Sequence, residues 1–169
     1  MAAGQTEPML IVFGGLPGSG KTTVSRELAR RMAATWLRVD AIEAAIGRSG
    51  ARPVGTAGYA VAAELAAAQL ALGGTVIVDA VHPVAVSRSG WPALAAEHGA
   101  AARFVEVVCA DPAALRRRVE QRLPDLTGHT PPTWAEVQAL PYEPWTGPRL
   151  TVDTSGTDPL PEILAYLQS

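Results

Sequence analysis

Cysteine and aromatic residues are scarce in this sequence of 169 residues, and charged residues of both signs make up only 18% of it. The single cysteine, Cys109, excludes an internal disulfide framework and a zinc site built from cysteines. The formal net charge is −2 without a basic tail or stripe, which argues against duplex nucleic acid as a main partner. No hydrophobic run is long enough to span a bilayer, and residues 1–8 lack the apolar core of a signal peptide. We therefore expect a soluble, cytoplasmic protein.

The sequence does contain enough hydrophobic residues to form a full-sized core. Hydrophobic residues make up 48% of the chain and no internal repeat divides it, so residues 1–169 are expected to form a single domain.

The most specific pattern lies in residues 9–23. Residues 9–13 are apolar and partly β-branched, which predicts a buried strand. The segment GLPGSGKT, residues 15–22, matches G-x-x-x-x-G-K-[ST] at every fixed position. Apolar residues then recur at helical spacing from Val24 to Met32, which predicts a helix over residues 21–34. Strand, glycine-rich loop and helix in this order indicate a site for a nucleoside triphosphate.

The chemistry of such a loop assigns its residues. Glycines let the backbone approach a phosphate, and the backbone N–H groups and the helix N-terminus supply partial positive charge. Lys21 is expected to reach the β- and γ-phosphates, and the hydroxyl of Thr22 is expected to hold Mg²⁺. The predicted nucleotide-binding residues of the loop are Gly15, Pro17, Gly18, Ser19, Gly20, Lys21, Thr22 and Thr23.

Two later predicted strands, over residues 36–40 and 75–79, each end in an acid, and ligands of open parallel sheets bind beyond such strand ends. Asp40 is expected to act as general base or anchor for a substrate hydroxyl, or to cap a short helix over residues 41–46. Glu43, one turn later, could assist Asp40, but a solvated helix face is the simpler expectation. Asp79 is expected to hold Mg²⁺ through water or orient the nucleophile, or to form a turn.

Arginines precede a proline-rich segment in the second half of the chain. A helix beginning at Asp111 carries Arg118 and Arg122, which are four residues apart and share a face. They either neutralise the triphosphate or form a solvated basic face. Residues 123–148 are repeatedly broken by proline and are predicted to form a lid, within which Thr133 and Glu136 form the capping box of a helix over residues 134–140.

The remaining predicted elements are strands over residues 103–109 and 149–153 and helices over residues 59–72, 91–98 and 160–167. The loop after the last strand, Thr154, Ser155 and Gly156, is a candidate adenine site through its backbone. Several further side chains could contact a substrate: Trp36, Tyr59, His82, His129 and the lid aromatics Trp134, Tyr142 and Trp145. Arg48 and Arg52, in the loop over residues 47–58, could clamp an acceptor or a phosphate, but solvation is the simpler expectation.

This arrangement resembles the P-loop small-molecule kinases over nearly the whole chain. That group includes shikimate, gluconate, adenylyl-sulfate and adenylate kinases, chloramphenicol phosphotransferase and the kinase half of phage polynucleotide kinase. The resemblance implies an α/β P-loop NTPase fold with a five-stranded parallel sheet in the order 2-3-1-4-5 and helices on both faces. It also implies that Asp40 is the base, that Arg118 packs on adenine and Arg122 contacts phosphate, and that the loop from Thr154 lines the base.

The first functional hypothesis is an ATP- and Mg²⁺-dependent phosphotransferase that acts on a hydroxyl of a small molecule, either a metabolite or an antibiotic-like compound. Its catalytic residues are Lys21, Asp40, Arg118 and Arg122. A nucleotide or polynucleotide 5′-kinase is the second hypothesis, although the short loop over residues 47–58 lacks a convincing arginine pattern for a nucleotide acceptor. A nucleotide-dependent regulatory ATPase is the third.

Overall fold

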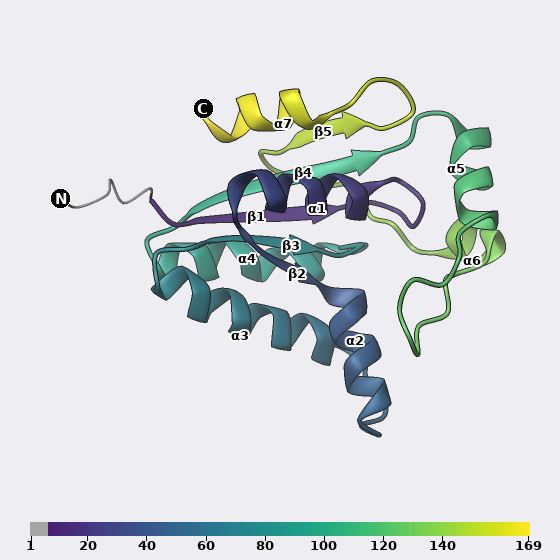
Figure 1. Cartoon of the computed structure of the whole chain (residues 1–169), viewed down its shortest axis with the longest axis horizontal. Helices are drawn as coiled ribbons and strands as arrows, with labels where there is room; N and C mark the ends of the chain where they lie inside the picture. The colour runs from purple at the N-terminus through teal and green to yellow at the C-terminus, as the bar shows by residue number, and fades with distance from the viewer. Residues whose placement is uncertain (1–6) are drawn as a thin grey trace.

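The computed structural model describes residues 7–169, and a five-stranded parallel sheet lies at its centre. The strand order is β2-β3-β1-β4-β5, as the resemblance implied, and all the arrows in Figure 1 point the same way. The strands are β1 (Met9–Gly14), β2 (Thr35–Arg38), β3 (Thr75–Asp79), β4 (Ala101–Val108) and β5 (Leu150–Asp153). None of the helices within residues 7–169 is long and apolar enough to cross a membrane.

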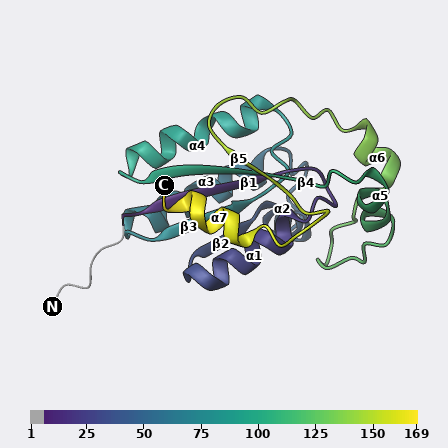
Figure 2. The ribbon, with the colours of Figure 1, turned by 90° about the horizontal axis from the view of Figure 1, so that it is seen from above.

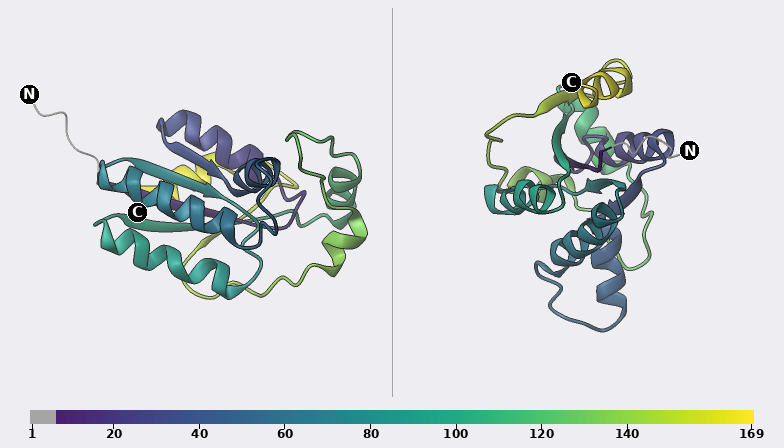
Figure 3. Two further views of the ribbon diagram at one scale, coloured as in Figure 1. Left: turned by 90° about the horizontal axis from the view of Figure 1, so that it is seen from below. Right: turned by 90° about the vertical axis from the view of Figure 1, so that its left-hand side faces the viewer.

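Helices cover both faces of the sheet, because alternate residues of the central strand are apolar on both sides. Ile11 and Phe13 of β1 pack with α1 (Lys21–Met32) and α7 (Leu160–Leu167). Leu10 and Val12 point the other way, toward α3 (Ala57–Ala71) and α4 (Ala85–Glu97). Figures 2 and 3 show these two helical layers with the sheet between them.

Three further helices lie at the carboxyl end of the strands. They are α2 (Val39–Arg48), α5 (Pro112–Glu120) and α6 (Trp134–Ala139), grouped at the right of Figure 1. The register aligns Arg38 and Phe13 with Asp79 across neighbouring strands. This edge of a parallel sheet is where ligands bind in doubly wound folds.

Most predicted elements are present, but the end of β2 differs. The strand stops at Arg38, so Asp40 lies in the first turn of α2 and does not end a strand as predicted. The chain turns into the helix at Val39, whose side chain is buried in the core that contains Ala62 and Ala66 of α3. Asp40 is also not the cap of that helix, because Arg38 occupies the cap position.

Two helix boundaries were also predicted wrongly. Helix α4 starts at Ala85, six residues before the predicted start, and Pro92 lies inside it. Only the amphipathic stretch over residues 91–98 was assigned to this helix from the sequence. Helix α5 ends at Glu120, so Arg122 lies beyond the helix and not on the same helical face as Arg118.

The predicted lid consists of two parts with different environments. Residues 123–140, including α6 with its capping box, lie beside the carboxyl edge of the sheet. Residues 141–148, here called the strap, return along α4 to β5. Trp145 of the strap is 6% exposed and covers Gly14, where an added Cβ would lie 2.1 Å from the indole ring.

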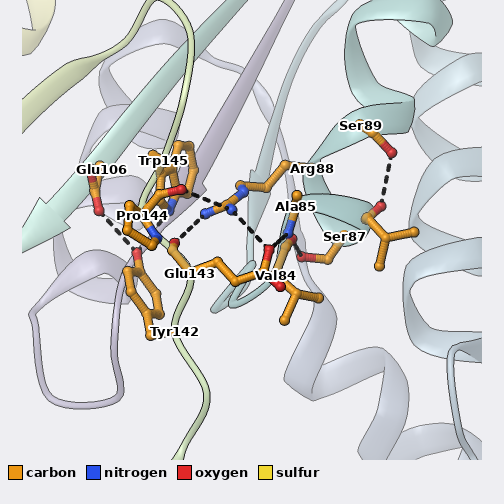
Figure 4. A network of polar contacts seen from close by, with 11 residues as sticks. Val84, Ala85, Ser87, Arg88, Ser89, Glu106, Tyr142, Glu143, Pro144 and Trp145 are labelled. Atoms are coloured by element: carbon orange, nitrogen blue, oxygen red, sulfur yellow. Dashed lines mark hydrogen bonds and ion pairs between the residues drawn. The ribbon is translucent and has the colours of Figure 1, made fainter.

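Arg88 of α4 fastens the strap, as Figure 4 shows. Its guanidinium donates to the carbonyls of Glu143 at 3.0 Å and Pro144 at 3.4 Å, and lies 5.0 Å from the centroid of the Trp145 ring. The indole N–H of Trp145 donates to the Tyr142 hydroxyl at 2.9 Å. The prediction that Tyr142 and Trp145 surround a substrate is therefore wrong, because both side chains join the strap to the body of the protein.

Candidate functional site

The glycine-rich loop leads directly from β1 into α1. Gly15 has a φ of +147°, and a Cβ there would lie 2.2 Å from the carbonyl oxygen of Val107. Gly20, with a φ of +92°, occupies the N-cap position of α1. No side chain caps this helix and no acid lies in its first turn, so its free N–H groups and positive dipole end are available to an anion.

A cavity of about 300 Å³ lies over this helix end, and we call it the loop cavity. It is lined by Gly18, Gly20, Lys21, Thr22, Thr23, Arg26, Arg118, Arg122 and Asp125. A second cavity of about 500 Å³, the lid cavity, lies between α2 and residues 129–140. Its polar lining side chains are Lys21, Asp40, Glu43, Tyr59, Arg122, His129, Thr130 and Glu136. Lys21 and Arg122 line both cavities, so the two spaces meet at these two cations.

Lys21 is only 5% exposed although it carries the amine of the loop. Burial lowers the pKa of Lys21, and the nearby carboxylates of Asp79 and Asp40 oppose that effect. A largely desolvated cation between two cavities attracts an anion more strongly than a solvated one.

Asp79 is a buried acid whose carboxylate lies beside Lys21 and Thr22 at the start of α1. It is 1% exposed, and neither carboxylate oxygen has a hydrogen-bond partner within residues 7–169. Burial raises the pKa of Asp79, while the ammonium of Lys21 and the hydroxyl of Thr22 lower it. Buried polar atoms are normally satisfied, so this orphaned carboxylate beside a hydroxyl fits a hard divalent cation. The described residues contain no group of three or more His, Cys, Asp or Glu placed for a metal, so phosphate and water oxygens would have to complete the ligand set.

Asp40 is joined to the lid through Arg38, which is 7% exposed. The Arg38 guanidinium lies 3.8 Å from Asp40 and donates to both oxygens of Asp125, at 2.5 and 3.1 Å. Arg122 lies 3.5 Å from the same Asp125 carboxylate. The hydrogen bonds from Arg38 lower the pKa of Asp125 to about 2, so Asp125 is an anion at neutral pH.

Arg118 connects the glycine-rich loop with the loop that follows β5. It donates to the hydroxyl and to the carbonyl of Thr154, both at 2.8 Å, and the Thr154 hydroxyl lies 2.6 Å from the Ser19 carbonyl. The structure thus brings together three residues that the sequence assigned to the nucleotide. Ser155 and Gly156 do not line the loop cavity, and the N–H and hydroxyl of Ser155 instead donate to Asp153.

Of the other residues predicted to contact a substrate, some line the lid cavity and some do not. Tyr59 and His129 line the lid cavity, whereas Trp134 lines neither cavity. The Trp36 indole donates to the Ser25 hydroxyl at 3.1 Å, which keeps it in the α1 layer and away from the lid cavity. Arg48 donates to the Thr127 carbonyl of the lid.

His82 is fully buried and lines neither cavity. Its Nδ1 lies 3.0 Å from the Phe13 carbonyl, and its Nε2 accepts from the Trp91 indole at 2.9 Å. Burial lowers the pKa of His82 to about 4, so the ring is neutral at pH 7. The prediction that His82 contacts a substrate is wrong, and the alternative of a loop hydrogen bonder is confirmed.

Four site residues were missed or misjudged from the sequence. Arg26 lies one helical turn after Thr22, and this spacing could have revealed it. Arg38 and Asp125 are 87 residues apart, and no local pattern signals their pairing. Glu43 is half-buried in the lid cavity and not on a solvated face, because α3 packs across it at Gly58.

Comparisons with known proteins agree with the fold. A family model described as an AAA domain matches residues 10–135. A candidate kinase from Chloroflexus aurantiacus superposes with a TM-score of 0.76 at 23% identity, covering 96% of this chain and 98% of that one. A gluconokinase from Sinorhizobium meliloti gives 0.65 at 22% identity, covering 96% and 98%. The Mycobacterium tuberculosis APS kinase CysC, in complex with AMPPNP and APS, gives 0.70 at 20% identity, covering 96% and 99%. No curated protein matches the sequence. These similarities confirm the P-loop NTPase fold.

Proposed function

The chain belongs to the AAA domain family, whose model spans residues 10–135, and from this premise we propose that it is an ATP- and Mg²⁺-dependent phosphotransferase acting on a hydroxyl of a small molecule. One observation carries the proposal. A cavity over the N-terminus of α1 and a second cavity containing Asp40 meet at Lys21 and Arg122. A donor phosphate and an acceptor hydroxyl need this kind of shared boundary.

The loop cavity would hold the triphosphate. The free N–H groups at the start of α1, together with Lys21 and Arg122, offer positive charge to the β- and γ-phosphates. Thr22 and Asp79 would hold Mg²⁺, which when bound neutralises phosphate charge. Arg118 and the loop of Thr154, Ser155 and Gly156 would lie at the nucleoside end.

The lid cavity would hold the acceptor. In the transfer step, the Asp40 carboxylate takes the hydroxyl proton while the hydroxyl oxygen bonds to the γ-phosphorus. The bond from the γ-phosphorus to the β–γ bridging oxygen breaks, and ADP leaves with that oxygen. Arg38, held by Asp125, lies 3.8 Å from the Asp40 carboxylate on the side of the lid.

The comparisons support this assignment. Two of the similar structures are named as a gluconokinase and an APS kinase, and the latter contains AMPPNP. A lid cavity of about 500 Å³ on the acceptor side of Lys21 favours an organic acceptor over water, and so favours a transferase over a regulatory ATPase.

The direct test is an ATP-consumption screen against metabolites and antibiotics, with product mass measured for the gain of one phosphoryl group. On an acceptor that is found, Lys21→Ala should abolish turnover. Asp40→Asn should lower kcat by about 10²-fold or more while the Kd for ATP changes little. Glu97→Gln, an exposed acid at the end of α4, is the charge-matched control and should retain the wild-type rate. Full activity in Asp40→Asn would overturn the base assignment, and ATP hydrolysis without any phosphorylated product would overturn the transferase.

A further inference from the structure

The charges that line the lid cavity are distributed unevenly. Its two strong cations, Lys21 and Arg122, lie at the boundary with the loop cavity, where the phosphates would be neutralised. Away from that boundary, the charged side chains among the described lining residues are Asp40, Glu43 and Glu136, and the one nitrogen side chain is His129. No other arginine or lysine of residues 7–169 lines this cavity.

The nearest additional guanidinium is already engaged. Arg38 gives both terminal nitrogens to Asp125 and does not line the lid cavity. A carboxylate, phosphate or sulfate on an acceptor would therefore face like charges without a cation to pair with beyond the transfer end.

Glu43 is the acid that most needs a partner. It lies three residues after Asp40 on α2, which places the two Cβ atoms about 5–6 Å apart. Its carboxylate has no hydrogen bond or ion pair within the described residues, and burial and then the Asp40 charge raise the pKa of Glu43. The side chain is held in place by α3, because a Cβ added at Gly58 would lie 2.3 Å from its Cγ.

Glu136 keeps its negative charge on the lid side of the same cavity. Its Oε2 accepts from the Thr133 N–H at 2.7 Å and from the Thr133 hydroxyl at 2.8 Å. These bonds lower the pKa of Glu136, so the carboxylate is ionised and fixed in direction.

The rest of the wall is apolar and suits an organic cation rather than a metal ion. Val39, Pro83, Pro131, Val137 and Leu140 contribute side chains to a space of about 500 Å³. The three acids do not form a group placed for a metal within the described residues. The binding site is the lid cavity, which opens onto Lys21, and its acids favour a bound molecule with a positive charge.

We infer that the acceptor is an alcohol with an apolar body and an ammonium group, and that Glu43 pairs with that ammonium while Asp40 faces the hydroxyl. This inference rests on the proposed function, since it takes the lid cavity as the acceptor site. The ammonium should lie within a few bonds of the hydroxyl, because Asp40 and Glu43 are one helical turn apart.

The test uses matched triplets of apolar alcohols as probes: an amino alcohol, its N-acetyl derivative and the hydroxy acid of the same skeleton, with two to four carbons between the functional groups. The wild-type protein should phosphorylate the amino alcohols with kcat/KM on the order of tenfold above their N-acetyl and acid counterparts. Glu43→Gln, which keeps the side-chain shape, should bring the amino alcohol to within about twofold of its N-acetyl derivative. Glu97→Gln should keep the wild-type ratio.

A second measurement, equilibrium binding of the same probes in the presence of Mg²⁺ and ADP, separates the two claims. Preferred transfer to neutral or acidic alcohols, or an unchanged preference in Glu43→Gln, would overturn this inference and leave the kinase proposal standing. Amino alcohols that bind through Glu43 but are never phosphorylated would overturn the kinase proposal and retain the charge preference. If no amino alcohol is phosphorylated and none binds in a way that depends on Glu43, the inference is overturned as well.

Discussion

Asp79 occupies a position that is costly in the absence of a cation. A carboxylate that is 1% exposed, with neither oxygen hydrogen-bonded to a described residue, is stabilised mainly by the nearby Lys21 ammonium. A magnesium ion bound with nucleotide would add the missing contacts. Asp79 is therefore the residue at which metal dependence should be most visible.

We expect Asp79→Asn to uncouple Mg²⁺ from nucleotide binding. In the wild type, AMPPNP at about 100 times its Kd should stabilise the fold by about 2.7 kcal/mol. That corresponds to a rise in Tm of about 5–10 °C. Part of this rise should disappear when EDTA removes Mg²⁺. In Asp79→Asn the rise should be the same with and without Mg²⁺, whereas exposed Glu64→Gln should behave as the wild type. An undiminished Mg²⁺-dependent increment in Asp79→Asn would contradict the metal assignment.

His82 makes the fold sensitive to acid for a different reason. Its pKa is lowered from 6.5 to about 4 by burial, so between these values the unfolded chain binds a proton that the folded chain does not. The contribution of His82 to the free energy of unfolding should therefore be fully present above pH 6.5. It should fall by about 3 kcal/mol as the pH decreases toward 4. Urea unfolding at pH 7 and pH 4.5 measures the loss.

The contribution of His82 can be isolated by substitution. His82→Gln should be less stable at pH 7, because the Phe13 and Trp91 contacts are weakened, but should lose less stability between pH 7 and 4.5. His98→Asn, near the exposed end of α4, is the control and should keep the wild-type dependence. Equal pH dependence in His82→Gln and the wild type would mean that His82 titrates like a solvated histidine.

At the scale of elements, the close packing of the strap on β1 should make Gly14 intolerant of any side chain. An alanine there would place its Cβ 2.1 Å from the Trp145 ring, which Arg88 and Tyr142 hold in position. Gly14→Ala should reduce the free energy of unfolding by about 1–3 kcal/mol, measured by urea denaturation. Gly90→Ala, on the exposed face of α4 with no atom within 4 Å, should instead stabilise by about 0.5–1 kcal/mol. Equal effects of the two changes on the free energy of unfolding would show that the strap moves away from β1 at little energetic cost.

Elements with a local signal were the ones that the sequence could predict. Strand β3 and helix α7 begin and end at the predicted residues, and the capping box of Thr133 and Glu136 is present. The strap was missed because its position depends on the Trp145 ring packing against the backbone of Gly14, which has no side chain and lies more than a hundred residues earlier in the chain. The end of β2 was missed for a similar reason, since Val39 turns into α2 to pack with α3.

At the scale of the whole molecule, the sequence located the glycine-rich loop and the acids near it because parallel strands end at one edge of the sheet. Lys21, Asp40 and Arg122 do line one cavity. The pairing of Arg38 with Asp125 joins β2 to the lid across 87 residues and could not be inferred from spacing. Yet Asp125 determines which cations of the site are already paired: it accepts two hydrogen bonds from Arg38 and lies 3.5 Å from Arg122.

Asp125 should affect the stability of the fold and the binding of nucleotide in opposite directions. Its carboxylate lines the loop cavity, is ionised at neutral pH and holds Arg38 and Arg122. Asp125→Asn should leave the buried Arg38 without its strongest partner. Since Asp125 is about half exposed, solvent screening limits the expected loss of stability to about 1 kcal/mol. The same change removes a negative charge beside the triphosphate and frees Arg122, which should lower the Kd for AMPPNP with Mg²⁺ by about three- to tenfold.

Urea unfolding and a nucleotide titration measure these two effects on the same protein. Glu120→Gln is the matched control, because it removes one negative charge from an exposed pair with Arg116 outside the loop cavity. That variant should change neither quantity appreciably. Weaker nucleotide binding in Asp125→Asn would show that the tie between Arg38 and the lid is required for the bound state. Tighter binding would show instead that the Asp125 carboxylate opposes the triphosphate, both by its charge beside the loop cavity and by its pairing with Arg122.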